Sequence, residues 1–154
     1  MAAAGCTARR GGSGEETSQV IEDFSMTQSA GGRKAWALAA PQARLLAEGG
    51  ARMLRPRIRI FREGREGSIA ESREAYVKDG SQDITLVGDV VIRSPQEKAV
   101  LRTDRLEYGA REGRFRTDSL VALERPGVRL RGRGLDADGA LAEIRIHHME
   151  SDLR

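Results

Sequence analysis

Apolar and charged residues alternate along much of this chain, most clearly between residues 55 and 62. Ile58 and Ile60 fall on one face of an extended segment. The positions on the other face are arginines, namely Arg55, Arg57 and Arg59. Because successive side chains of a strand point to opposite faces, this pattern predicts a strand with one buried and one solvated side.

The same period of two recurs along the chain. Phe24 and Met26 share a face near the N-terminus, and Gly88 interrupts an apolar series from Ile84 to Ile92, where a bulge or a close backbone approach is expected. Further strands are predicted over Val100–Tyr108, Arg114–Leu123, Val128–Leu135 and Leu141–Met149. The segment Ala39–Ala47 reads as a short helix or as strand or irregular structure, and Pro41 favours the latter.

Eight turn signals separate these segments at intervals of roughly fifteen residues. They are Gly31-Gly32, Gly49-Gly50, Gly64 to Gly67, Asp79-Gly80, Ser94-Pro95, Gly109 to Gly113, Pro126-Gly127 and Asp138-Gly139. Glycine and Asx residues take the positive φ angles that tight hairpins need. We therefore predict an all-β fold of about nine or ten antiparallel strands, arranged as a jelly roll or twisted two-sheet roll that is open at its edge strands.

A short internal repeat supports hairpins of similar design. Residues 102–106, Arg-Thr-Asp-Arg-Leu, recur at 116–120 as Arg-Thr-Asp-Ser-Leu. The interval is that of one strand with its turn, so the repeat predicts two adjacent strands that share a design, with a chance echo as the alternative.

The chain length of 154 residues suits one folded domain with a tail. Residues 1–18 contain Gly, Ser and charged residues without apolar periodicity and predict a flexible tail or linker, which leaves residues 19–150 for the roll. Aromatic residues make up only 4%, so the core must consist of Ile, Val, Leu and Ala. No apolar stretch approaches the length of a membrane-spanning helix.

Charge and candidate chemistry argue against nucleic acid and against catalysis. The net charge of +3 comes from interspersed charges, and base-stacking aromatics are scarce, so no nucleic-acid partner is expected. His147 and His148 are adjacent in a predicted strand, point to opposite faces and cannot chelate one metal ion. Asp104 and Asp118 belong to the repeat and are expected to be structural. We expect no enzyme activity, no metal and no cofactor.

The first six residues end in Ala-Gly-Cys, the pattern that precedes acylation in bacterial lipoproteins. The charged and apolar region that must come before such a site is missing. Cys6 is therefore either a lipidation site whose leader lies upstream or an ordinary thiol of the tail, and as the single cysteine it forms no internal disulfide.

Several segments, taken in order, resemble one protein family. They are Ile21–Met26, a Gly-Gly-Arg turn, Trp36–Ala40 with Ala43, Ile58–Phe61, Leu86–Ile92, Leu101–Tyr108 and Leu130–Asp138. This series is similar to the LptC family, the periplasmic component of lipopolysaccharide export, and spans about residues 20–149. The LptA protein and the N-terminal domain of LptD share the same OstA-like roll, but the segment from Trp36 to Ala43 favours LptC. The family's usual N-terminal transmembrane helix is not found here, so either an upstream segment or a lipid on Cys6 is expected to anchor the protein.

The resemblance implies a site for lipid A acyl chains between the two sheets of the roll. The candidate lining residues are Phe24, Trp36, Leu38, Ile58, Ile60, Leu86, Val90, Ile92, Leu106, Tyr108, Phe115, Val121, Leu123, Leu130, Ile144 and Ile146. The alternative for each is plain sandwich core. Weak contacts to lipid phosphates are expected from Arg55, Arg57, Arg59, Arg129, Arg131 and Arg133, for which a solvated outer face is the alternative.

The resemblance also implies partners and a location. The C-terminal strand is expected to bind an LptA-like periplasmic protein, and the N-terminal strand to bind LptB/LptF/LptG-like subunits of the inner-membrane lipopolysaccharide ABC transporter. The expected location is the periplasm, attached to the inner membrane. Three alternatives remain open: a structural scaffold or adaptor without lipid cargo, an LptA-like soluble bridge protein, and a cytoplasmic protein whose basic surface binds polyanions.

Overall fold

The computed structural model describes residues 17–78, 80 and 83–150, and every element in that part of the chain is a β-strand. In chain order the strands are β1 (Thr17–Ala30), β2 (Arg33–Leu46), β3 (Ala51–Leu54), β4 (Arg57–Arg62), β5 (Arg65–Glu71), β6 (Glu74–Val77), β7 (Ile84–Ser94), β8 (Ala99–Gly109), β9 (Arg114–Arg125), β10 (Val128–Asp138) and β11 (Ile144–Glu150). The predicted all-β antiparallel fold is confirmed, and the eight turn signals lie at or beside strand junctions. Among the described residues no helix is long and apolar enough to cross a bilayer.

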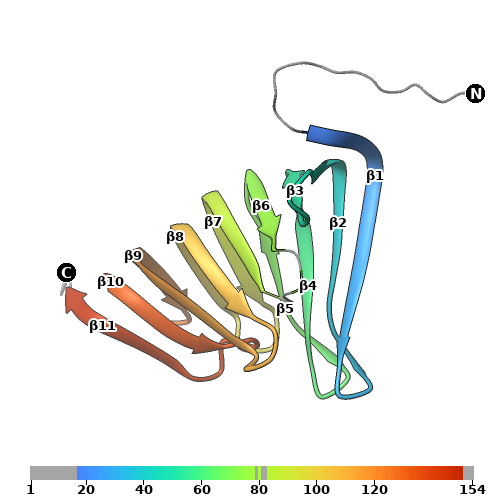
Figure 1. The fold of residues 1–154 in the computed structure, drawn as a ribbon. Coiled ribbons are helices and arrows are strands. Elements are labelled where there is room, and N and C mark those ends of the chain that lie inside the picture. The colour runs from blue at the N-terminus through green and yellow to red at the C-terminus, as the bar shows by residue number, and fades with distance from the viewer. Residues whose placement is uncertain (1–16, 79, 81–82, 151–154) are drawn as a thin grey trace, which may run out of the picture.

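The strands lie in chain order across the sheet if β3 and β4 are counted as one interrupted strand, and β5 and β6 as another. β3 and β4 both pair with β2, and β5 and β6 both pair with β7, while β3 pairs with β6 and β4 with β5. β3 and β4 are therefore halves of one bent unit, and β5 and β6 halves of the next. The eleven strands, slightly more than the nine or ten predicted, thus form nine bent units in an antiparallel meander. The units run from β1 at one end of the molecule to β11 at the other (Figure 1).

Each unit bends near its middle, so that the sheet folds into two arms that face each other (Figure 1). We call the half that contains β3 and β6 the β3/β6 arm, and the half that contains β4 and β5 the β4/β5 arm. The bends carry residues that depart from strand geometry. Asp23 and Arg55 have φ angles of 55° and 52°, and Gly88 and Gly134 have φ angles of 89° and 87°. The line of bends therefore depends on left-handed backbone, which glycine adopts without strain and other residues do not.

The bend of β7 shows this geometry in detail. The pairing between β7 and β8 shifts between Val87 and Val90, and the backbone N–H of Arg73 donates to the Gly88 carbonyl at 2.9 Å. A Cβ on Gly88 would lie 3.1 Å from the Arg73 Cβ. The predicted bulge and the predicted close approach are therefore both present at Gly88.

The five-residue repeat lies at the bend of the adjacent strands β8 and β9, beside another register shift. The Thr103 hydroxyl donates to the Leu120 carbonyl at 2.7 Å, and the Thr117 hydroxyl donates in return to the Arg105 carbonyl. Both threonines are buried, and their hydroxyls supply partners for carbonyls where the ladder is irregular. The two copies of the repeat thus make equivalent threonine hydrogen bonds to each other's strand, and these bonds stabilise the bend. This agrees with the prediction that the two adjacent strands share a design.

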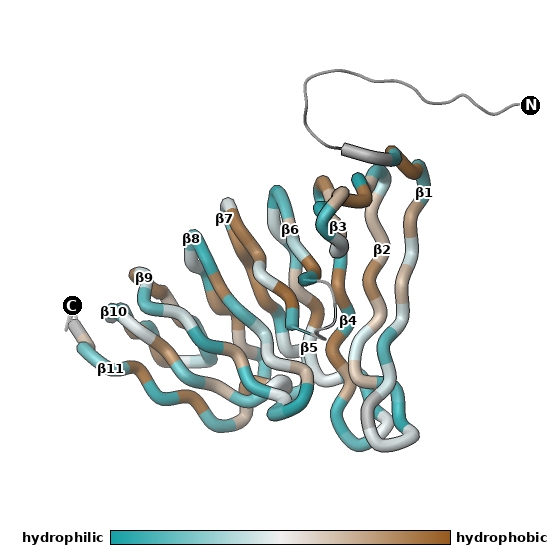
Figure 2. The backbone as a smooth tube through the Cα atoms, viewed as in Figure 1, coloured by the Kyte–Doolittle hydropathy of each residue, from teal (hydrophilic) through white to brown (hydrophobic). Residues whose placement is uncertain are grey.

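The core lies between the two arms. Trp36 from β2 and Phe115 from β9 are fully buried, and the rings of Tyr108 and Phe115 pack with centroids 4.9 Å apart. Apolar and polar positions alternate along the strands (Figure 2). The burial of the side chains follows the same alternation, so that one face of each arm is buried and the other is solvated. Full burial of a large apolar side chain contributes about 1.5–3 kcal/mol, so this interior is the main source of stability.

Two segments refine the sequence-based picture. β2 continues as one strand through Ala39–Leu46, which rules out the short helix; Pro41 lies opposite Asp23, where β1 has positive φ. The strand predicted over residues 141–149 begins only at Ile144. Leu141 has a φ of 59°, and its N–H donates to the Asp138 carbonyl at 3.0 Å within a tight turn, so it cannot extend the strand.

Candidate functional site

Most of the predicted lining residues meet in the interior between the arms. Twelve of them are buried there: Trp36, Leu38, Ile58, Ile60, Leu86, Val90, Ile92, Leu106, Tyr108, Phe115, Val121 and Leu123. They come from both arms and pack into a single apolar cluster. In the middle of the roll the side chains therefore fill the interior.

The remaining lining candidates lie near the two ends of the roll and are half-buried. They are Phe24 on β1, Leu130 on β10, and Ile144 and Ile146 on β11. Beyond them, Met149 on β11 is 53% exposed and Val128 on β10 is 42% exposed, whereas Val20 on β1 lies opposite Arg44 on the outer face. The apolar interior therefore reaches solvent at the N-terminal and C-terminal ends of the sheet.

The two end strands also present backbone hydrogen-bonding groups. Within the described residues β1 pairs with β2 alone, and β11 pairs with β10 alone. Each strand therefore has one edge whose N–H and C=O groups can pair with a strand of another chain. β11 as described ends at Glu150, opposite Arg131 in the middle of β10.

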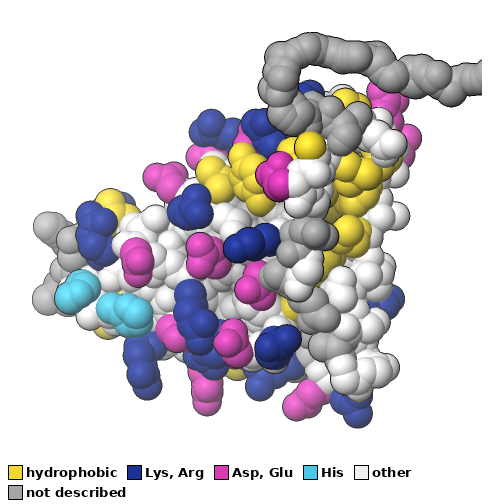
Figure 3. Space-filling view, viewed as in Figure 1, with side chains coloured by type: hydrophobic (Ala, Val, Ile, Leu, Met, Phe, Trp, Pro, Cys, Tyr) yellow, Lys and Arg dark blue, Asp and Glu magenta, His cyan; other side chains and the backbone are white. Residues whose placement is uncertain are grey.

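The six candidate headgroup arginines lie on the outer surface. All six are exposed: Arg55, Arg57, Arg59, Arg129, Arg131 and Arg133. Three of them form ion pairs, Arg57 with Glu71 at 3.0 Å, Arg59 with Glu66 at 3.8 Å and Arg129 with Glu124 at 3.5 Å. Acidic and basic side chains are interspersed on the face seen in Figure 3. The arginines therefore belong to a solvated face of mixed charge and do not converge on the interior.

Two surface hollows were not anticipated from the sequence. One, of about 510 Å³, follows the line of bends and is lined by Val90, Thr103, Leu120 and Val121, among others. The second, of about 780 Å³, lies near the tips of the β3/β6 arm and has both polar and apolar walls, which include Tyr76, Val77 and Arg116. Gly88 and the five-residue repeat lie next to the first hollow. Sequence signals for bulges, such as a glycine inside a strand, could therefore have indicated its position.

The turn between β10 and β11 was predicted only as a hairpin signal, but it does more than connect two strands. Residues 138–143, from the last residue of β10 to the residue before β11, are called the mouth loop here, and they cross from the β3/β6 arm to the tips of the β4/β5 arm. The Gly139 N–H donates to the Gly113 carbonyl at 3.0 Å, and the Ser68 hydroxyl donates to the Gly139 carbonyl at 2.6 Å. A Cβ on Gly139 would lie 3.0 Å from Ile60 Cγ2 and 3.5 Å from the Tyr108 hydroxyl, so the loop lies between both arms. We call this region of facing tips the mouth.

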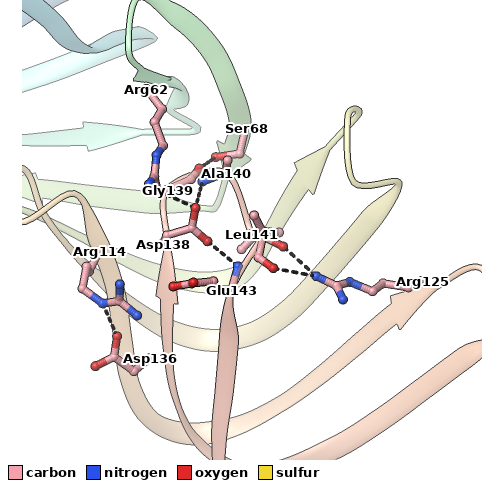
Figure 4. Close-up of polar contacts among 11 residues, drawn as sticks. Arg62, Ser68, Arg114, Arg125, Asp136, Asp138, Gly139, Ala140, Leu141 and Glu143 are labelled. Carbon is pink, nitrogen blue, oxygen red and sulfur yellow. Dashed lines mark hydrogen bonds and ion pairs between the residues drawn. The ribbon is translucent and has the colours of Figure 1, made fainter.

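Charged groups fix the mouth loop in place (Figure 4). Arg62 Nη1 lies 2.6 Å from Asp138 Oδ2, and the Asp138 side chain is only 5% exposed. The other carboxylate oxygen accepts a hydrogen bond from the Glu143 N–H at 2.7 Å. Arg125 Nη2 donates to the Leu141 carbonyl at 2.8 Å, and the Leu141 side chain is fully buried in the core. No sequence signal beyond the Asp-Gly turn indicated this cluster.

Two electrostatic environments near the mouth shift pKa values. The hydrogen bond from Arg114 lowers the pKa of the Asp136 carboxyl on the outer face of β10. Burial raises the pKa of Tyr108 to about 12, with a smaller opposing effect of Arg62. Tyr108 is therefore a neutral, apolar-facing part of the interior at physiological pH.

The remaining candidates supply no reactive group in the described part of the chain. His147 and His148 are both exposed on β11, and no cluster of three or more His, Cys, Asp or Glu residues that could hold a metal ion occurs within residues 17–78, 80 and 83–150. Cys6 lies outside the described residues. What the geometry offers is an apolar interior with two open ends and two free edges.

Such an arrangement defines a β-roll that can hold apolar groups and can join other rolls at its edges. The chain belongs to the family described as "Lipopolysaccharide-assembly, LptC-related", which matches residues 6–149. Among curated proteins, none is similar enough in sequence to count as a relative of this chain. Family membership gives the protein a role in lipopolysaccharide assembly and transport, as a periplasmic component, and the family is not one of enzymes.

Proposed function

We propose that this protein accepts lipopolysaccharide from an inner-membrane ABC transporter and passes it to an LptA-like bridge protein. The observation that carries the proposal is the course of the apolar interior, which runs from β1 to β11 and is half exposed at both ends. A carrier that joins its neighbours edge to edge needs apolar surface at the joints, so that cargo can cross from one roll to the next.

Hydrocarbon burial would supply most of the affinity. Each buried CH₂ contributes about 0.8 kcal/mol, so half-burying one chain of about twelve carbons contributes roughly 5 kcal/mol. An exposed ion pair contributes only about 0.2–1 kcal/mol. The exposed arginines, Arg131 and Arg133 among them, would then contact lipid phosphates weakly, which suits a carrier that must release its cargo.

The edges suggest how partners would bind. A strand of an LptA-like roll would pair with the free edge of β11. An LptF/LptG-like periplasmic domain would pair with the free edge of β1, and the LptB-like ATPase subunits of the same transporter would drive export from the cytoplasmic side. Either an upstream segment or a lipid on Cys6 would attach the protein to the inner membrane. One acyl chain gives only marginal binding, so stable attachment would need a second signal.

Photo-crosslinking in cells tests this proposal with matched neighbours on one strand. A photoreactive residue at Ile146, which faces the interior, should trap lipopolysaccharide, whereas the same residue at Arg145, which faces outward, should not. Phe24 and Ser25 form the equivalent pair on β1. Equal or absent trapping at the inward and outward positions of both pairs would contradict lipid carriage.

The filled centre favours one alternative, a scaffold that binds partners through its edges and carries no lipid. Its interior side chains, such as Trp36 and Phe115, are fully buried and leave the centre of the roll occupied. A scaffold would show partner crosslinks at the free edges of β1 and β11 and no lipid adduct at Ile146. The same experiment therefore separates the two functions.

A further inference from the structure

The mouth loop differs from the other hairpin turns of the roll. Added Cβ atoms at Gly31, Gly64 and Gly127 in three other turns would meet nothing within 4 Å, so those turns project into solvent. In the mouth loop, by contrast, an added Cβ on Gly139 would touch Ile60 from the opposite arm. A turn that lies against the other arm has a role beyond connecting β10 to β11.

The loop presents an apolar group and an anionic group in a defined arrangement. Leu141 is fully buried among the core side chains, although its φ of 59° lies in the left-handed region that leucine disfavours. Asp138 places a carboxylate oxygen 2.6 Å from Arg62 at the tip of the β4/β5 arm. An apolar side chain in the interior beside an anion on an arginine is also the arrangement that a bound anionic lipid would adopt.

We propose that the mouth loop is a built-in competitor for an anionic amphiphile and that it must leave the mouth for such a lipid to enter the interior from the side. The inference rests on the proposed function and names the place where the lipid would be admitted. With the loop withdrawn, Leu141 vacates an apolar slot, and Arg62 and Arg125 lose the groups that they now bind. The lipid's hydrocarbon takes the slot and its phosphate takes the arginines.

The polar groups left behind suit a phosphate. Arg125 Nη2 donates to the Leu141 carbonyl, while Arg125 Nε is buried and has no hydrogen-bond partner within the described part of the chain. An arginine with an unused buried donor can make a further hydrogen bond to an oxyanion. The Ser68 hydroxyl, which donates to the Gly139 carbonyl, is a third donor at the same place.

The contacts that hold the loop can be broken without unfolding the roll. They amount to the burial of one side chain, Leu141, an ion pair from Arg62 and hydrogen bonds from Ser68, Arg125 and Gly139. These contacts join the loop to strands whose own pairing does not depend on it. Segments with few contacts and a strained residue open at lower free energy than the core. Opening also relieves the left-handed backbone at Leu141.

A reversible disulfide tests the proposal. A Cβ on Gly67 would lie 3.2 Å from the Ala140 Cβ, close to the separation of about 3.5–4.5 Å in disulfides, so G67C/A140C should lock the loop shut when oxidised. Cys6 is replaced by Ser in every variant. Binding of fluorescently labelled lipopolysaccharide should slow at least tenfold on oxidation and recover on reduction, while the single-cysteine variants G67C and A140C should not respond.

A second pair of variants acts in the opposite direction. D138N removes the charge that Arg62 binds and should speed lipopolysaccharide binding several-fold, and it should raise hydrogen exchange at the Ala140 and Leu141 amides. D136N alters a neighbouring carboxylate that pairs with Arg114 on the outer face, and it serves as the control with unchanged binding.

The outcomes separate this inference from the proposed function. If the locked and reduced forms of G67C/A140C bind lipopolysaccharide at the same rate, the proposed function stands and the gating role of the loop is wrong. If neither form nor the unmodified chain binds it, both are wrong. A D138N variant that matches D136N in both binding and hydrogen exchange would also overturn the gating role. Lipid A lacking phosphates should bind D138N more weakly than phosphorylated lipid A does. Equal binding of the two would show that Arg62 and Arg125 do not bind the lipid phosphate.

Discussion

The centre of the roll and its two ends are made from the same kind of side chain but differ in exposure. Phe115 on β9 is fully buried, whereas Phe24 on β1 is only half-buried, although both face the interior. Among the strands that the structure describes, central units have a neighbour on each side, and β1 and β11 have a neighbour on one side only. The difference teaches that the centre supplies stability, and that the ends hold apolar surface which the described strands do not cover.

The largest expected effect comes from truncating the same residue type in the two regions. Phe115→Ala should lower the free energy of unfolding by about 3–5 kcal/mol, because it leaves a cavity in a filled core. Phe24→Ala should lower it by about 1 kcal/mol, because a half-exposed ring loses less burial. Urea unfolding of both variants measures the comparison, and equal losses would show that the ends are as well packed as the centre.

Glycines at a central bend and at a peripheral turn give a smaller contrast. Gly88 and Gly127 both have positive φ, so alanine strains either position by about 1 kcal/mol. At Gly88 the new methyl also lies 3.1 Å from the Arg73 Cβ, whereas at Gly127 it meets nothing within 4 Å. Gly88→Ala should therefore destabilise the roll by roughly 1–2 kcal/mol more than Gly127→Ala. A thermal unfolding series that ranks them in the opposite order would contradict the role of the bend.

A pH dependence of moderate size is expected from two carboxyls, one central and one near the C-terminal end. Hydrogen bonds from Arg52 and Arg114 lower the pKa values of Glu74 and Asp136 below their ordinary values of 4.5 and 3.8. Ionisation is therefore favoured in the folded state. The stability from these pairs is present above the ordinary pKa values and is lost as the pH falls through the lowered ones.

Unfolding free energies measured between pH 6 and pH 3 would test this. These limits lie roughly one to two pH units above and below the ordinary pKa values of carboxyl groups. Asp136→Asn and Glu74→Gln should each flatten the acid decline relative to the unmodified chain. If both variants keep the full decline, other carboxyls control acid stability.

The smallest effect is expected at the exposed arginines. Arg129 is 85% exposed on the side chain and lies 3.5 Å from Glu124 across strands, so Arg129→Ala should leave the unfolding midpoint unchanged within error. The same variant should bind lipopolysaccharide nearly as well as the unmodified chain. A large loss of binding at Arg129 alone would give the outer face a role that its mixed charge does not suggest.

Alternation and turn chemistry were enough to predict the strands and their hairpin order from the sequence. The segment with Ile58 and Ile60 behaves as a strand because only a period of two buries both isoleucines. Gly88 forms a bulge because glycine takes its φ of 89° without strain and leaves room for Arg73. The bends themselves were harder to predict. In β8 the buried residues Thr103 and Leu106 are three positions apart, so the period of two is broken at the bend. From the sequence alone such a break looks like a weak strand pattern, and only the pairing with the neighbouring strand identifies it as a bend.

Other features depend on contacts between distant residues and leave no local signal. Asp138 and Arg62 are separated by 76 positions, and nothing in the sequence around either one indicates the ion pair. Leu141 looks like the first residue of a strand because apolar residues follow at intervals, yet the Asp138 carboxylate and the opposite arm hold it in a turn. Tertiary contacts therefore give the mouth loop a turn conformation, although its local sequence pattern predicts a strand.

The meander also fixes how deep the interior is. Neighbouring strands of a sheet lie about 4.8 Å apart, so the eight gaps between the nine bent units give roughly 38 Å from β1 to β11 before twist shortens it. Larger side chains cannot lengthen that distance, because strand spacing is set by backbone hydrogen bonds. A longer route can be made only by adding whole units, either within the chain or from another roll at one of its free edges.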